Sequence, residues 1–192
     1  MKTAFPAAIL LCGLLCISGC GGDSSAPPPS RVIGQYIGIF NDAAVDNFNP
    51  ILAKNPPFDL WDITFIAFLH TFPHAGAYVV DFENARGGGA PNPGDTDGDR
   101  VAKLIAAARK KNPAMKFVIS LGYGSSDLAN AATTPEAFAD SVVKLLQDND
   151  LDGFDIDYEE INTLEMSDEA FRILITTIRN RLDQTGKNIC LS

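Results

Sequence analysis

Short apolar segments alternate with helical segments along residues 31–192, and this alternation constrains the fold more than any other feature of the sequence. The apolar segments contain little polar alternation, which is typical of strands buried on both faces, as in parallel sheets. We expect strands at five of them: residues 32–40, 63–69, 116–121, 154–158 and 189–191.

The segments between these strands carry helix signals. An apolar stripe runs at helical spacing from Val101 to Ala108 and ends before Pro113. Thr134 and Ser167 each precede an acidic residue and a further apolar stripe, a pattern typical of helix starts, and Gly186 is suited to a helix end. Helices between successive strands predict right-handed βαβ units, and therefore an α/β fold with a parallel sheet.

Residues 1–19 have the pattern of a signal peptide. Lys2 precedes an apolar run over residues 4–17, which is shorter than the roughly 20 apolar residues of a membrane-spanning helix. The run ends in Ile17-Ser18-Gly19-Cys20, which resembles a bacterial lipobox, so we expect cleavage before Cys20 and lipid on its side chain. The expected location is the bacterial cell envelope, at the outer membrane or the cell surface; ordinary secretion is the alternative.

The expected organisation therefore has three parts. Residues 1–19 are the signal peptide, residues 20–30 are a tether rich in Gly, Ser and Pro, and residues 31–192 are the folded domain. The tether contains too few apolar residues to form a core, and it holds the domain away from the lipid.

The charge balance excludes one class of partner. Lys and Arg total 15, whereas Asp and Glu total 24, which gives a net charge of −9. Nucleic acid is an unsuitable partner for such a chain, because binding to phosphates needs clustered cations. Asp95, Asp97 and Asp99 suggest a calcium loop, but Arg100 and Ala106 occupy the positions where an EF-hand needs Gly and Glu. We expect these acids to cap a helix instead.

The segment with the clearest chemistry is residues 151–160, LDGFDIDYEE. Alternate residues of a strand share a face, so Asp155, Asp157 and Glu159 are expected on one face, with the apolar residues between them turned toward helices. Carboxylates buried side by side are costly, and such a row is typical of a functional site. Glu159 lies nearest the C-terminal rim, where parallel α/β folds place their sites, and is the expected general acid. A solvent-facing strand and a hard-cation site are the alternatives.

The segment Asp152–Glu159, DGFDIDYE, resembles the DGxDxDxE signature of the family 18 glycoside hydrolases, the chitinases and endo-β-N-acetylglucosaminidases. The order of elements is similar as well, with Gln35-Tyr36 in the first strand, Phe68 in the second and Ser120-Leu121-Gly122 in the third. The resemblance implies a TIM-type (β/α)8 barrel, of which about the first four βα units and the start of the fifth strand are present. A whole barrel needs about 250 residues, so we expect a C-terminally truncated part of a longer gene product.

The resemblance also implies a retaining, substrate-assisted hydrolysis of β-1,4-linked N-acetylglucosamine in chitin or a related glycan. Glu159 protonates the glycosidic oxygen while the 2-acetamido carbonyl of the substrate attacks the anomeric carbon. Asp157 orients the acetamido group, and Asp155 shares a proton with Asp157. The resemblance implies no cofactor and no metal. The supporting residues that it implies on the first and third strands are Tyr36, Ser120 and Gly122.

Two positions depart from the family pattern. Tyr123 stands where the third strand usually has a second glycine, and Tyr158 stands where chitinases often have tryptophan. Two alternatives to hydrolysis also remain: a chitinase-like protein that binds glycans without cleaving them, and an inactive fragment. Because family lectins commonly lack the acid, the presence of Glu159 favours the enzyme.

Aromatic residues near the second strand have two interpretations. We expect them to pack in the core at least as often as they stack on sugar rings, because large aromatic side chains bury much apolar area. These residues are Trp61, Phe72, Tyr78 and Phe82.

Overall fold

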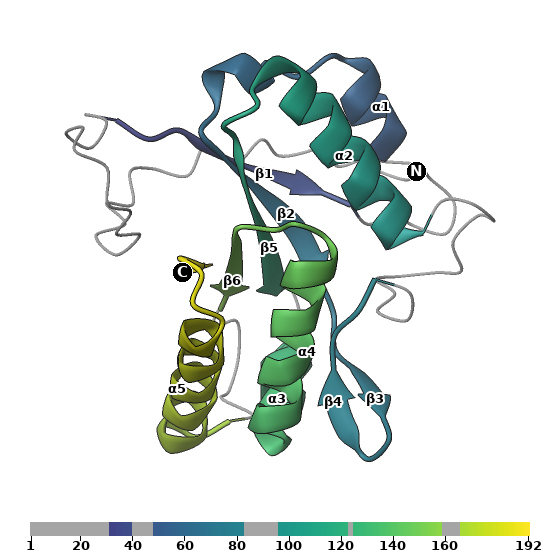
Figure 1. The fold of residues 1–192 in the computed structure, drawn as a ribbon. Helices are drawn as coiled ribbons and strands as arrows, with labels where there is room; N and C mark the ends of the chain where they lie inside the picture. The colour runs from purple at the N-terminus through teal and green to yellow at the C-terminus, as the bar shows by residue number, and fades with distance from the viewer. Residues whose placement is uncertain (1–30, 40–47, 83–95, 123–124, 159–165) are drawn as a thin grey trace, which may run out of the picture.

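A computed structural model describes residues 31–39, 48–82, 96–122, 125–158 and 166–192. Its centre is a parallel five-stranded sheet with the order β1-β2-β5-β6-β7 (Figure 1). This confirms the expected α/β fold with a parallel sheet, and each expected apolar segment supplies one strand. The strands are β1 (Gly34–Gly38), β2 (Ile63–Leu69), β5 (Lys116–Gly122), β6 (Gly153–Asp157) and β7 (Cys190–Leu191).

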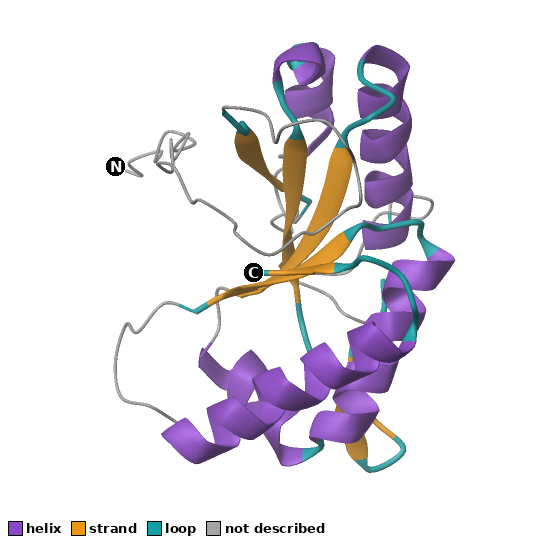
Figure 2. Cartoon of the chain, turned by 60° about the vertical axis from the view of Figure 1, so that its left-hand side comes forward, coloured by secondary structure: helices purple, strands orange, loops and turns teal. Residues whose placement is uncertain are grey.

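Helices connect the strands and lie along one side of the curved sheet (Figure 2). The three helices that the sequence predicts are present as α2 (Asp97–Lys111), α4 (Pro135–Asp148) and α5 (Asp168–Gln184). Four elements were not predicted from the sequence: α1 (Phe48–Ala53), the 3-10 helix η1 (Phe58–Leu60), α3 (Ser125–Thr133) and the hairpin of β3 (Phe72–His74) and β4 (Ala77–Val79). No helix in the described part of the chain has the length and apolar character needed to cross a membrane.

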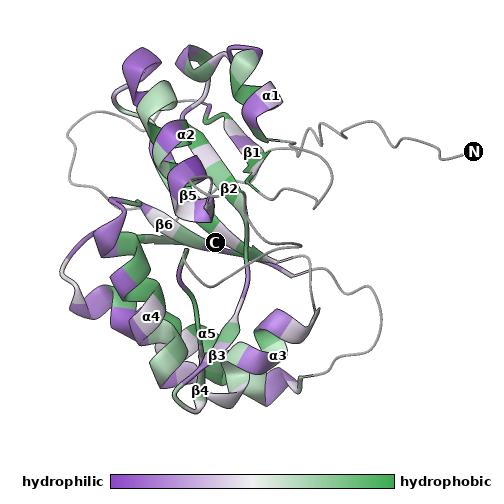
Figure 3. Ribbon diagram, turned by 90° about the vertical axis from the view of Figure 1, so that its right-hand side faces the viewer, coloured by the Kyte–Doolittle hydropathy of each residue, from purple (hydrophilic) through white to green (hydrophobic). Residues whose placement is uncertain are grey.

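One face of the sheet packs against the helices through large apolar side chains. Phe117, Ile119 and Leu121 of β5 and Phe154 of β6 point toward the helices and are fully buried there. Phe154 meets Phe138 of α4 edge to face, with ring centroids 6.1 Å apart. The helices display both hydrophobic and hydrophilic stretches in Figure 3, as expected for helices that cover a sheet with one stripe.

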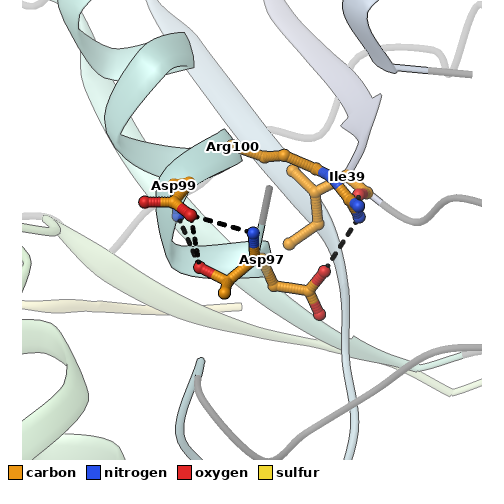
Figure 4. A network of polar contacts seen from close by, with 5 residues as sticks. Ile39, Asp97, Asp99 and Arg100 are labelled. Atoms are coloured by element: carbon orange, nitrogen blue, oxygen red, sulfur yellow. Dashed lines mark hydrogen bonds and ion pairs between the residues drawn. The ribbon is translucent and has the colours of Figure 1, made fainter. Parts of the chain in front are cut away.

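The N-terminus of α2 is fixed to the end of β1. Thr96 and Asp99 form a capping box, in which the Thr96 hydroxyl accepts from the Asp99 N–H and the Asp99 carboxylate accepts from the Thr96 N–H. Arg100 is buried and donates to the Ile39 carbonyl at 2.7 Å and to Asp97 at 3.1 Å (Figure 4). Asp99 thus caps the helix, as the sequence predicts, whereas Asp97 in the same turn pairs with Arg100 and Asp95 lies outside the described residues.

Thr134 shows how tertiary contacts change a local prediction. It directly precedes α4, as expected, but its side chain makes no capping bond to that helix. Its hydroxyl accepts instead from the N–H of Tyr78 at 2.9 Å, and Ser141 of α4 accepts from Val80 at 3.0 Å. The hairpin β3–β4 is therefore fixed to α4. The Thr134 hydroxyl, which the sequence predicts to cap α4, binds the hairpin instead.

Candidate active site

A buried carboxylate, Asp155 on β6, lies at the centre of the site. It is 6% exposed, and three hydroxyls from three other strand segments donate to it. Tyr36 of β1 and Ser120 of β5 bond Oδ2 at 2.9 and 2.7 Å, and Ser192, which directly follows β7, bonds Oδ1 at 2.8 Å. Three donors offset the cost of burying the carboxylate, because each replaces a hydrogen bond that the group would make to water.

The strand register places Ser120 beside Asp155, because these two residues are Cα partners in the pairing of β5 with β6. Tyr36 comes from further away, since β1 and β6 are separated by β2 and β5. In a flat sheet those three strand spacings amount to about 14 Å, which exceeds the reach of a tyrosine. The 2.9 Å bond therefore requires the sheet to curve, and stacking on Phe65, with centroids 4.7 Å apart, holds the Tyr36 ring in place.

Asp157 lies two residues further along the same face and is half-buried. Its Cα partner on β5 is Gly122. A Cβ atom at Gly122 would lie 2.8 Å from the Asp157 Cβ, 2.9 Å from the Asp157 carbonyl oxygen and 3.1 Å from the Phe68 ring. Only glycine leaves room for Asp157 here, so the Gly122 of the sequence pattern has a direct steric role beside the second acid.

The structure thus brings together five of the predicted site residues through direct bonds or contact. Tyr36, Ser120 and Asp155 share a hydrogen-bonded group, and Gly122 lies against Asp157. Glu159, the predicted proton donor, and Cys20, the predicted lipidation site, lie outside the described residues.

The aromatic residues mostly pack away from these acids. Tyr158 stacks on Phe171 of α5, with centroids 5.5 Å apart, so it faces the helices as the strand alternation predicts. Trp61 meets Phe58 edge to face at the start of β2, the end of the strand opposite the acids. Phe82 is buried in the core. The ring contact of Trp61 and the burial of Phe82 confirm core packing for these two residues.

Ser192 was not among the predicted site residues. Its N–H donates to the Phe154 carbonyl at 3.2 Å and its carbonyl accepts from the Ile156 N–H at 3.1 Å, so it continues the pairing of β7 with β6. The available signal was a single hydroxyl in an apolar strand, on the same face as Cys190 by strand alternation. That signal has a meaning only once the neighbouring strand is known.

A second polar cluster joins the residues that follow β2 to the first turn of α3. Asp127 in the first turn of α3 is 7% exposed and accepts three hydrogen bonds. The Thr71 N–H and hydroxyl bond Oδ1 at 2.7 Å each, and His70 Nδ1 lies 2.8 Å from Oδ2. Burial by itself raises the pKa of Asp127, but the bonds from His70 and Thr71 outweigh it, and the pKa lies below the ordinary value of 3.8. The carboxylate is therefore charged at neutral pH.

Metal ligation finds no support in the part of the chain that the structure describes. Within these residues, no group of three or more His, Cys, Asp or Glu side chains has the arrangement needed to hold a metal ion.

The sequence was compared with models of known protein families. The family model described as "Glycosyl hydrolases family 18" matches residues 34–192. The chain belongs to this family. Solved members are TIM barrels, and the curved parallel sheet corresponds to the first part of such a barrel.

The similar proteins are much longer than this chain. Chitinase B of Serratia marcescens is 29% identical over 166 residues, which are 80% of this chain and 32% of that protein. The crystal structure of the chitinase ChiW from Paenibacillus is 24% identical with a TM-score of 0.57, over 84% of this chain and 21% of that one. Human YKL-39, described as a pseudo-chitinase with retained chitooligosaccharide binding, is 16% identical with a TM-score of 0.58, over 83% of this chain and 42% of that one.

The three donors to Asp155 differ in their access to water, which leads to a prediction for stability. Ser120→Ala removes a donor at a site that is 0% exposed, so we expect a loss of about 1.5–3 kcal/mol in the free energy of unfolding. Tyr36→Phe keeps the ring stack, and because Tyr36 is 37% exposed, water can replace its hydroxyl; we expect a loss below about 1 kcal/mol. Urea unfolding measures both, and equal losses would contradict this account.

The Asp127 cluster predicts a pH dependence. A lowered folded-state pKa means that the charged form stabilises the fold above about pH 3.8, and that this stabilisation is lost as the pH falls through the lower folded value. Asp127→Asn should therefore be less stable than the unmodified protein at pH 7, and the difference should shrink below pH 4. Urea unfolding across a pH series tests this, and a difference that stays constant down to about pH 2 would refute it.

Proposed function

We propose that this protein hydrolyses β-1,4-linked N-acetylglucosamine glycans, chitin or a related polymer, with retention of configuration. The observation that carries the proposal is the group of three hydroxyls around Asp155, in a chain that belongs to family 18. Asp155 lies two residues before Asp157, on the same face of β6. A carboxylate this buried and this fully bonded is costly to maintain, and such groups cluster at functional sites.

In the proposed reaction, Glu159 donates its proton to the glycosidic oxygen as the bond to the anomeric carbon breaks. The 2-acetamido carbonyl oxygen of the same sugar attacks that carbon, which gives an oxazolinium ion and retains configuration after water adds. Water loses its proton to the Glu159 carboxylate as it attacks, and the acid is restored. The reaction therefore needs one water molecule besides the groups of the substrate and of the chain.

The other two acids act on the acetamido group. Asp157 accepts a hydrogen bond from the acetamido N–H, which turns the carbonyl oxygen toward the anomeric carbon and stabilises the positive charge that develops. Asp155 shares a proton with Asp157 and is held in one orientation by Tyr36, Ser120 and Ser192. A carboxylate fixed in this way offers Asp157 a constant partner before and after the substrate binds.

A second candidate function is glycan binding without hydrolysis. The likeness in fold to human YKL-39, a pseudo-chitinase with retained chitooligosaccharide binding, favours it. The residue that distinguishes the two functions is Glu159, because hydrolysis needs a proton donor whereas binding does not.

Replacing the proton donor separates these candidates. In the protein expressed from its complete reading frame, Glu159→Gln should lower kcat on chitooligosaccharides by at least about 100-fold and leave their binding intact. Glu169→Gln, on the exposed first turn of α5, is the matched control and should keep its activity. Turnover that survives Glu159→Gln excludes the assigned role, and binding without turnover in the unmodified protein supports the second candidate.

We further propose that Cys20 carries lipid, that residues 20–30 form a tether, and that residues 31–192 form the catalytic domain held at the cell envelope. Cys20→Ser should abolish incorporation of labelled palmitate in a bacterial host, because the serine lacks the thiol that receives the lipid. Cys16→Ser, inside the apolar run, serves as the control and should leave the labelling unchanged. Labelling that persists in Cys20→Ser would support ordinary secretion.

A further inference from the structure

The His70–Asp127 pair lies outside the group of residues that acts on the acetamido group, and the proposed reaction does not use it. His70 directly follows β2, and its side chain is 22% exposed, while that of Asp127 is 9% exposed. One ring nitrogen, Nδ1, lies 2.8 Å from Asp127. Since Asp127 is charged, it accepts a hydrogen from Nδ1, and the second nitrogen, Nε2, is left on the far side of the ring from Asp127.

The pair lies at the same end of the sheet as the acids. Ala67 of β2, Ser120 and Asp155 are in register, and Phe68 lies against Gly122 in the next row, where Asp157 is. His70 follows two residues later, and β5 alone separates β2 from β6. With two strand spacings between them, the backbones of His70 and Asp157 are about 10 Å apart, a separation that a bound oligosaccharide spans.

We propose that His70 is a substrate-binding residue, whose Nε2 forms a hydrogen bond to a hydroxyl of a sugar next to the one that reacts. This inference rests on the proposed function and names a specific contact for it. Asp127 is then a positioning residue, because it fixes the orientation of the imidazole ring and the position of the hydrogen on Nδ1. Sugar hydroxyls both donate and accept, so they suit an imidazole nitrogen whose partner nitrogen is already bonded.

The competing explanation is purely structural. Asp127 also binds the N–H and hydroxyl of Thr71, the residue before hairpin β3–β4, so the cluster fixes the hairpin to α3 whether or not a sugar binds. A structural role needs Nδ1 of His70 but not Nε2. This difference defines the experiment.

His70→Asn separates the two nitrogens. The asparagine amide nitrogen occupies the place of Nδ1 and still donates to Asp127, whereas nothing replaces Nε2. We expect the free energy of unfolding to be retained, the KM for chitotetraose to rise about three- to tenfold, the effect of one hydrogen bond, and kcat to stay within about twofold. His74→Asn is the matched control, because His74 is an exposed histidine at the end of β3, four residues after His70, and the KM of this variant should be unchanged.

Chemical modification gives a second readout. Diethyl pyrocarbonate should modify both histidines of the free protein, and chitotetraose should protect His70 more than His74, because only His70 binds the sugar. The inference is overturned if the KM of His70→Asn is unchanged and chitotetraose does not reduce the modification of His70. The proposed function survives that result as long as the unmodified protein still cleaves chitotetraose. If the unmodified protein neither binds nor cleaves chitotetraose, the proposed function fails, and the inference fails with it.

Discussion

The hydrogen bond from Tyr36 to Asp155 is the interaction on which the site depends. It joins β1 to β6 across two intervening strands, so it forms only in a strongly curved sheet. Ser120 and Ser192 reach the same carboxylate from the two neighbouring strand segments, one on each side of β6. One buried acid thereby ties together three segments far apart in sequence, and their hydroxyls together offset the cost of its burial.

Large residues such as Phe117 and Phe154 fill the space under the helices, whereas the small residues Ala67 and Gly122 lie near the acids on the opposite face. Gly153 shows how tight this face is, because a Cβ there would lie 2.8 Å from that of Cys190. The absence of a side chain at Gly122 is likewise what leaves room for Asp157.

The sequence predicted the strands, the main helices and the grouping of Tyr36 and Ser120 with Asp155, because these features follow from local periodicity and from one dense motif. It missed α3, the hairpin β3–β4 and the capping failure of Thr134, whose hydroxyl bonds to Tyr78 rather than to its own helix. It also missed the partnership of His70 with Asp127, which are 57 residues apart in the chain. Each of these depends on a contact between elements, and no local pattern encodes which elements will meet.

The amino-acid sequence by itself determined that Asp155 and Asp157 share one face of a strand and that apolar residues between them face the helices, because strand alternation has a period of two. Only the tertiary structure decided which groups surround those acids. Ser192 and Tyr36 are ordinary strand residues in the sequence, and they become donors to Asp155 because the parallel register and the curvature of the sheet bring their hydroxyls to one point. Distances across a sheet are set by packing, which is a property of the whole fold.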